Sequence, residues 1–431
     1  MVNGASLNGR TKRRGIPLGA MRYPEFRKYW FATLASVIGF QMVMFSQLWL
    51  VRQLEESPLW LGAVGMANGV PSIVLTLFGG VLADRIPQKR LIMLTQTLMG
   101  SLVLLLAVLT MLGVVEVWHV LAIGFVSGAV NAFDAPARQA IFPNLIERKE
   151  MVSAVALNSS IWQGTRMVAP MFSGIIIAAF GTSTSLFIGA AGFLSMAVLI
   201  SRLNVPLVTR TRRNSAVHDL VEGARYVRDN VLFSSLIGMT FFNSFFGMAY
   251  LQLMPIFTID VLKKSAAAQG ALMSAGGVGA LLGTAVVALL GRVRRRGLLI
   301  VFGSACFGML IVGFGLSHWY LLSIAFLFLS GFFQSVYMIS IMSTLQMKVP
   351  DDLRGRVMGI YGMTYNLMPL GGMLAGGVAS ALSAPFAVAV GGGAVTGFAL
   401  FNGAFHRTVR GLRAEMSQDG GREAAAGAAR R

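Results

Sequence analysis

The sequence has little of what a soluble enzyme needs. It holds a single cysteine, Cys306, and four histidines without metal-ligand spacing, so we expect no disulfide, no metal site and no cofactor. Charged residues are only 12% of the chain, and acidic residues are the scarcer kind, 17 against 36 lysines and arginines. There is no G-x-x-x-x-G-K-[ST] phosphate loop and no cluster of nucleophile, base or metal ligands. These absences argue against an ATP-driven pump and against an enzyme.

Apolar surface is what the chain has in abundance. Hydrophobic residues make up 55% of it and its mean hydropathy is +0.69, more than a soluble core buries. Apolar stretches of about 20 residues or more, enough to cross about 30 Å of hydrocarbon, recur along the whole chain. They lie at 30–51, 59–83, 91–113, 117–141, 153–180, 184–203, 231–256, 269–290, 298–316, 320–347, 357–382 and 385–405. We therefore expect an all-α membrane protein with twelve transmembrane helices and a lipid bilayer as its surroundings.

These stretches divide the chain into five parts. We expect a cytoplasmic N-terminal segment at 1–29, a six-helix bundle at 30–203, a cytoplasmic linker at 204–230, a second six-helix bundle at 231–405 and a disordered cytoplasmic tail at 406–431. In the linker, Ala216, Leu220, Ala224 and Val227 recur at helical spacing, which predicts an amphipathic helix on the membrane surface or across the two halves.

The positions of the basic residues predict the orientation. Arg52, Lys263 and Lys264 lie on one side of the predicted membrane and Arg166 lies within a span, whereas the other 32 lie on the side of both termini. By the positive-inside rule, both termini are expected in the cytoplasm. Because the basic residues recur at every second loop, the net charge of +19 does not indicate nucleic-acid binding.

Two landmarks repeat in one register. The turns near Asp84 and Gly291 are 207 positions apart, as are Pro143 and Pro350. This indicates two parallel repeats with a substrate site between them near the midplane, reached by alternating access.

The turn after the second span reads G-V-L-A-D-R-I-P-Q-K-R, from Gly80 to Arg90. It resembles the signature loop of the major facilitator superfamily, from which it departs at Pro87 and Gln88. The resemblance implies the major facilitator fold and a conformational-switch loop, in which Asp84 faces the N-terminus of helix eleven. The residues assigned to this loop are Gly80, Asp84, Arg85, Lys89 and Arg90. The alternative is a basic turn that only sets topology.

A narrower resemblance covers nearly all of 23–405. The segments D-A-P-A-R-Q-A from Asp134, A-L-N-S from Ala156 and L-R-G-R-V-M-G from Leu353 resemble the bacterial subgroup of enterobactin exporters and macrolide efflux proteins, the transmembrane secretion effectors. This implies a monomeric secondary transporter of the bacterial inner membrane that exports a siderophore-like or amphipathic small molecule or drug, coupled to protons. The alternatives are a facilitator or importer of a nutrient and a non-transporting sensor or scaffold. The fifth span, from Gly164 to Pro170, resembles the antiporters' G-x-x-x-G-P motif, with Ala169 in place of its second glycine.

Charges inside the spans are the strongest pointers to function, because they are costly in hydrocarbon. Arg166 lies roughly 20 Å into its helix, where it either meets an anionic or hydroxylated substrate, moves between a protein carboxylate and the substrate, or bonds to backbone carbonyls. Asp134 lies roughly 10 Å from the cytoplasmic end of span four. It either carries protons or forms, with Arg138 one turn later, an ion pair that fixes the cytoplasmic gate.

Amide side chains in the spans complete the candidates. With Arg166, the residues expected to line the substrate cavity are Gln41, Asn131, Asn243, Gln334 and Asn366. Phenylalanines at 241, 242, 245 and 246 surround Asn243, a mixture that suits a large amphipathic ligand. For each amide, the alternative is helix packing through an interhelical hydrogen bond.

Overall fold

The computed structural model describes residues 19–204, 216–290, 296–351 and 353–406, and of 77–85, 216–220 and Leu290 only the backbone. The predicted N-terminal segment up to residue 18, the basic run of the linker and the predicted C-terminal tail from 407 lie outside this part. Within the described residues the structure is helical and has no strand.

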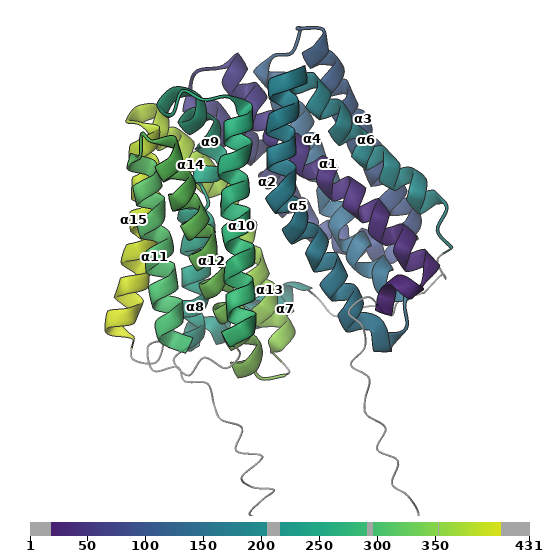
Figure 1. The fold of residues 1–431 in the computed structure, drawn as a ribbon. Coiled ribbons are helices and arrows are strands. Elements are labelled where there is room, and N and C mark those ends of the chain that lie inside the picture. The colour runs from purple at the N-terminus through teal and green to yellow at the C-terminus, as the bar shows by residue number, and fades with distance from the viewer. Residues whose placement is uncertain (1–18, 205–215, 291–295, 352, 407–431) are drawn as a thin grey trace, which may run out of the picture.

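The N-terminal half is a bundle of six long helices. They are α1 (Pro24–Leu54), α2 (Pro58–Arg85), α3 (Gln88–Met111), α4 (Val117–Ile141), α5 (Met151–Phe180) and α6 (Thr182–Ser201). Short helical turns η1 (Gly19–Arg22), η2 (Phe142–Leu145) and η3 (Arg148–Glu150) flank α1 and join α4 to α5. Figure 1 shows this half in purple and blue.

The C-terminal half forms a second bundle, coloured green to yellow in Figure 1. Its elements are α8 (Val231–Phe242), η4 (Asn243–Gly247), α9 (Tyr250–Ile256), η5 (Phe257–Val261), α10 (Ala266–Leu290), α11 (Arg296–Leu316), α12 (Tyr320–Lys348), α13 (Arg354–Tyr365), α14 (Met368–Ala381) and α15 (Ala384–Phe405). The linker holds α7 (Ala216–Asp229), which packs on α13 through a 2.8 Å ion pair between Arg356 and Glu222.

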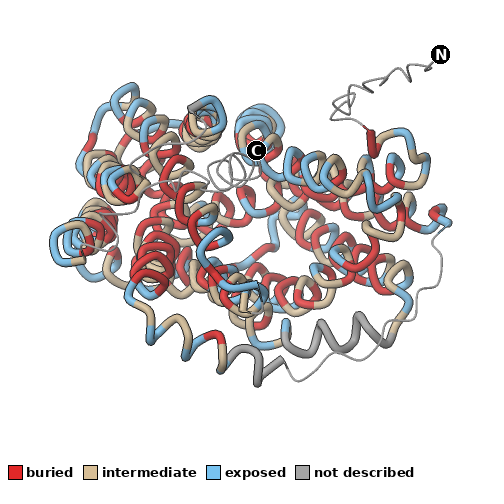
Figure 2. Tube along the Cα trace, turned by 90° about the horizontal axis from the view of Figure 1, so that it is seen from below, coloured by how far each residue is buried: buried red, intermediate tan, exposed pale blue. Residues whose placement is uncertain are grey.

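The twelve-span fold predicted from the sequence is confirmed. Ten helical stretches of the described part are long and apolar enough to cross a membrane. The fifth span is α5, which has 30 residues but carries the polar Gln163 and Arg166 in its middle. The eleventh span is α13 followed by α14. Large apolar side chains such as Phe31, Leu94 and Leu321 are exposed on the outside, as lipid contact requires. Figure 2 shows exposed residues on the outer rim and buried ones where helices face each other.

The eleventh span, expected from the sequence at 357–382, consists of two helices in the structure. The helix breaks at Asn366 and Leu367, between α13 and α14. Pro369 explains the break, because proline has no N–H for the carbonyl of Tyr365, four residues earlier, and its ring clashes with that carbonyl.

The seventh span is also irregular. The Met248 N–H bonds to the Asn243 carbonyl at 2.8 Å, and the Leu262 N–H bonds to the Phe257 carbonyl at 2.8 Å, so η4 and η5 are π-helical. Such segments are rare and occur often at functional sites. From the sequence, a single span is expected here, at 231–256.

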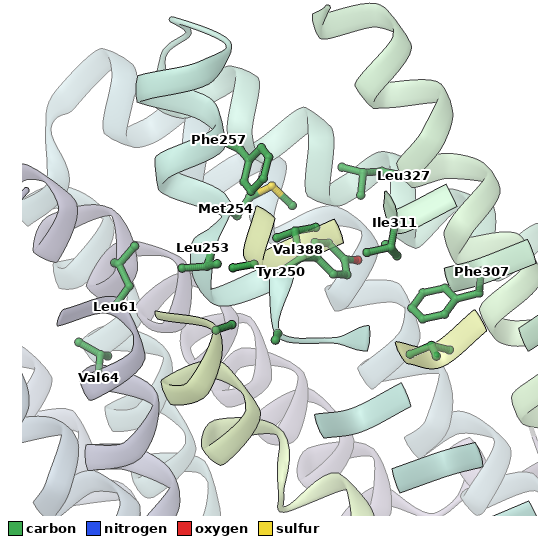
Figure 3. Close-up of a cluster of buried hydrophobic side chains, with 14 of the residues drawn as sticks. Leu61, Val64, Tyr250, Leu253, Met254, Phe257, Phe307, Ile311, Leu327 and Val388 are labelled. Atoms are coloured by element: carbon green, nitrogen blue, oxygen red, sulfur yellow. The ribbon is translucent and has the colours of Figure 1, made fainter. Parts of the chain in front are cut away.

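The two halves meet along two seams, α5 on α10 and α2 on α14. Glycine permits the close approach at each. A Cβ on Gly277 would lie 2.8 Å from the Met167 Cα, and one on Gly69 would lie 2.4 Å from the Pro369 Cβ. Figure 3 shows the apolar core continuing across, with Leu61 of α2 beside Leu253 of α9.

Both seams lie in one half of the molecule's length. We name the end where α1 begins and α15 finishes the terminal end, and the end where α1 finishes and α2 begins the distal end. Along α5 the close glycine contacts run from Met167 to Gly174, and along α2 from Pro58 to Gly69, in both cases toward the distal end. In Figure 1 the bundles accordingly meet at the top, the distal end, and spread toward the terminal end.

Candidate functional site

An ion pair between the halves closes the distal end. Arg52, in the last turn of α1, donates from Nε to one oxygen of Asp260 at 3.0 Å and from Nη2 to the other at 2.7 Å. Asp260 lies in η5 of the other half. The Arg52 side chain is 14% exposed and that of Asp260 35%. This two-point geometry matches the planar guanidinium to the carboxylate and fixes the approach of α1 to the seventh span.

Apolar side chains from both halves fill the space beneath this pair. We name this cluster the distal seal; it consists of Phe45 and Trp49 of α1, Ile177 of α5 and Ala266 of α10, with Ile259 and Met273 packed against them. The sequence did not reveal the seal or the ion pair, because no spacing rule connects residues 208 positions apart.

Asp134 lies in a closed polar network of the N-terminal half. Its side chain accepts hydrogen bonds from Thr95 Oγ1 at 2.7 Å, Gln96 Nε2 at 3.0 Å and Arg138 Nε at 2.5 Å. Ser36 of α1 completes the ring, because its hydroxyl accepts from Arg138 Nη2 at 2.7 Å and donates to Gln96 Oε1 at 2.9 Å. The network ties α1, α3 and α4 together.

The burial of this network is unusual for charged groups. Asp134 is 4% exposed and is the one charged residue in the buried class among the described residues. The Arg138 side chain is 14% exposed, and its Nη1 is buried with no hydrogen-bond partner in the described part. The pairing of Asp134 with Arg138 was expected from their spacing. The partners Ser36, Thr95 and Gln96 on other helices were not, because short polar residues in spans usually serve packing.

Arg166 lies halfway along α5, next to the point where the halves part. Met167, the next residue, is the α5 residue nearest the terminal end that meets a glycine of α10, Gly277. Arg166 itself is exposed, as is Trp162 one turn before it. Its electrostatic neighbours are the hydroxyls of Tyr250 and Tyr365 of the other half.

Tyrosines of the C-terminal half face this point. The hydroxyls of Tyr361 and Tyr365 in α13 are 3.0 Å apart, and Tyr365 is 44% exposed. Asn366, one of the predicted cavity residues, is exposed at the break that follows. The tyrosines were missed because nothing in the sequence separates a hydroxyl at a helix break from one in an aromatic belt.

Asn243 and Gln334, both predicted cavity residues, are brought together. Asn243 Oδ1 accepts from Gln334 Nε2 at 3.2 Å and from the Tyr337 hydroxyl at 2.5 Å. Asn243 is 1% exposed, so it supports Gln334 rather than facing open space. Gln41 and Asn131 are half-buried in α1 and α4.

The remaining predicted residues belong to none of the clusters described above. Gly164 has open space beside it, and Pro170 is buried where its carbonyl meets Gly270 of α10. In the switch loop, Lys89 Nζ donates to the Leu203 carbonyl at 2.7 Å and Arg90 is exposed. Gly80, Asp84 and Arg85 lie in the last turns of α2, outside the described side chains.

The family comparison covers almost the whole chain. The transmembrane secretion effector family matches residues 16–418. The staphyloferrin A transporter of Staphylococcus aureus (strain NCTC 8325 / PS 47) is 23% identical over 332 residues, 76% of this chain and 82% of the relative. The enterobactin exporter EntS of Shigella flexneri is 24% identical over 340 residues, 79% of this chain and 81% of the relative.

Solved structures show the same fold. The nucleoside transporter NupG has a TM-score of 0.70 at 13% identity, covering 89% of this chain and 99% of its own. A bacterial homolog of the human lysosomal transporter Spinster, in an inward-facing and unoccupied conformation, has a TM-score of 0.66 at 14% identity, covering 88% and 95%.

Proposed function

The chain belongs to the transmembrane secretion effector family of major facilitator transporters, and from this premise we propose that it is a proton-driven exporter of a siderophore-like or amphipathic small molecule. Transport by a multi-pass membrane protein follows from the family and the fold. The direction, the coupling ion, the substrate and a monomeric working unit are our proposal. Two relatives carry siderophore transport in their names, which supports the substrate class.

The orientation follows from charge. From their positions in the sequence, 32 of the 36 basic residues belong to the side of both termini, so we place the terminal end in the cytoplasm. The seams and the distal seal then close the periplasmic side, and the halves part toward the cytoplasm. In this conformation an exporter takes up its substrate.

The Asp134 network is the observation that carries the proposed coupling. The Asp134 carboxyl group accepts hydrogen bonds from Thr95, Gln96 and Arg138 and donates none, which is the arrangement of a carboxylate without its proton. An antiporter that exports substrate has released its proton to the cytoplasm in this conformation. Protonation from the periplasmic side, after the halves exchange, weakens the hold on Arg138, whose Nη1 already lacks a partner.

Helix α1 connects the network to the distal end. Ser36 belongs to the network and Arg52 to the distal ion pair, 16 residues apart on one helix or roughly 24 Å. A change in the protonation of Asp134 therefore acts on the helix that holds the distal end closed. In this way, binding and release of the proton are coupled through α1 to the opening of the distal ion pair.

Transport into inverted vesicles tests the proposal. A panel of catecholate siderophores and amphipathic drugs is offered with and without a proton gradient, acid inside. We expect gradient-driven accumulation of at least one compound, and expect Asp134→Asn to abolish both this accumulation and its pH dependence. Asp351→Asn, at an exposed acid outside the network, is the control. Full accumulation with an unchanged pH profile in Asp134→Asn would show that the carboxylate is structural.

A further inference from the structure

The close glycine contacts of each seam stop beside polar residues, three of which stand out. On the α5 seam, Arg166 comes immediately before Met167, which makes the glycine contact nearest the terminal end. On the α2 seam the corresponding contact is Gly69 with Pro369, and Tyr365 and Asn366 come just before Pro369. Arg166 belongs to one half and Tyr365 and Asn366 to the other; all three are exposed, and Arg166 interacts electrostatically with Tyr365 across the halves.

Arg166 brings a positive charge without a counter-ion. No ion pair or hydrogen bond among the described residues engages its side chain, and its charge acts on the hydroxyls of Tyr250 and Tyr365 in the other half. By contrast, Arg52 and Arg138, which lie in the last turns of α1 and α4, each hold a carboxylate. A charge kept in the middle of a span without a partner marks a ligand site.

The opposite wall adds donors suited to an anion. Tyr361 and Tyr365 share one hydrogen bond at 3.0 Å, and two hydroxyls that share one bond retain a second proton to donate. Asn366 supplies an amide. The 14-residue α14 begins at Met368, so its positive N-terminal end lies beside Asn366.

Aromatic and apolar surface adjoins these donors. Trp162, one turn from Arg166, is 44% exposed and meets Phe40 edge-on with ring centroids 6.2 Å apart. Met363 of α13 is 42% exposed. A ligand held by Arg166 therefore has flat apolar surface beside its charged group.

We propose that Arg166, Tyr365 and Asn366 bind the oxyanion of an amphipathic aromatic substrate, and that Trp162 contacts its ring. The substrate class is an aromatic anion whose charge is carried on oxygen, as in a carboxylate, a sulfonate or an ionised catechol. This deepens the proposed function by naming the chemistry the exporter selects. The binding itself rests on the conformation described above and needs no proton gradient.

Equilibrium binding to the purified full-length protein in detergent tests the site. Radiolabelled naphthalene-2-sulfonate keeps its charge at every working pH, and naphthalene-2-sulfonamide is its neutral counterpart of equal size. We expect the sulfonate to bind about tenfold more tightly, the preference expected of a hydrogen bond to a charged group. Arg166→Gln removes this preference, Arg166→Lys retains part of it, and Tyr365→Phe reduces it.

Arg202→Gln, at an exposed arginine that ends α6, is the matched control and keeps the preference. Thermal unfolding of each variant verifies that it is folded, and Arg166→Lys keeps the test valid should Arg166→Gln not fold. Equal binding of the two probes, no binding of the sulfonate, or an intact preference in a folded Arg166→Gln overturns the inference. None of these outcomes bears on proton-driven export, which the vesicle assay tests separately.

Discussion

Neutralising the distal ion pair should open the distal end of the protein. Asp260→Asn removes the negative charge whose two oxygens accept hydrogen bonds from Arg52 Nε at 3.0 Å and Nη2 at 2.7 Å. Exposed ion pairs contribute about 0.2–1 kcal/mol and hydrogen bonds to charged groups about 1.5–3 kcal/mol. The Arg52 side chain is 14% exposed and that of Asp260 35%, so the pair is only partly accessible to solvent. We therefore expect a contribution between these two ranges, about 1–2 kcal/mol. That energy shifts the balance between closed and open distal ends by a factor of roughly 5–30.

Cysteine accessibility measures this shift directly. The protein has one native cysteine, so Cys306→Ser gives a cysteine-free background, and Ala266→Cys places a thiol within the distal seal. Ala266 is 2% exposed, so a membrane-impermeant maleimide added from the distal side reacts only when the seal opens. We expect Asp260→Asn to raise the labelling rate roughly 5–30-fold, in line with the shift above.

The charge-swapped pair supplies the control. Arg52→Asp combined with Asp260→Arg restores opposite charges and should bring the labelling rate back toward that of the unmutated pair. A rate in Asp260→Asn within a factor of about two of the starting protein, less than 1 kcal/mol, would refute the reasoning. So would a double variant that labels as fast as the single one.

Three further predictions concern the seam, the switch loop and the topology. Gly277→Val should lower the stability of the folded protein by about 1–3 kcal/mol, because its Cβ meets the Met167 backbone. The measurement is the midpoint of thermal unfolding in detergent, which should fall. Gly397→Val, at a helical glycine of α15 with open space beside it, is the control and should change the midpoint little. Asp84→Asn should slow transport at equal expression while leaving binding intact, since the loop biases exchange between conformations; unchanged turnover would leave the loop with a topological role alone. Reporter fusions at both termini should give cytoplasmic signals, and periplasmic signals at both would reverse the membrane orientation.

The sequence predicted the fold because apolar length and charge position are local signals. Each span is a continuous stretch that can be counted, and Lys and Arg mark alternate loops. The Asp134–Arg138 pair was likewise predictable, since both residues lie on one helix at the i,i+4 spacing. The sequence does not reveal the helix break at Asn366, even though Pro369 follows it. Many membrane helices contain a proline and continue past it, so the proline alone does not predict a break.

The contacts between halves were beyond reach of the sequence. Arg52 and Asp260 are each ordinary helix-end charges, and only the packing of α1 against the seventh span makes them partners. The network around Asp134 forms only because the packing of three helices brings Ser36, Thr95 and Gln96 to it. Such sites depend on the three-dimensional order of helices, which hydropathy does not encode.

The most direct test of proton-driven export is the movement of protons with substrate. Inverted proteoliposomes are loaded with a trapped fluorescent pH indicator, and a compound found to accumulate is added outside. We predict that its entry makes the lumen more alkaline, as protons leave in exchange, and that Asp134→Asn abolishes this change whereas Asp351→Asn retains it. Accumulation of the compound with no change in luminal pH, or an equal change in Asp134→Asn, would contradict it.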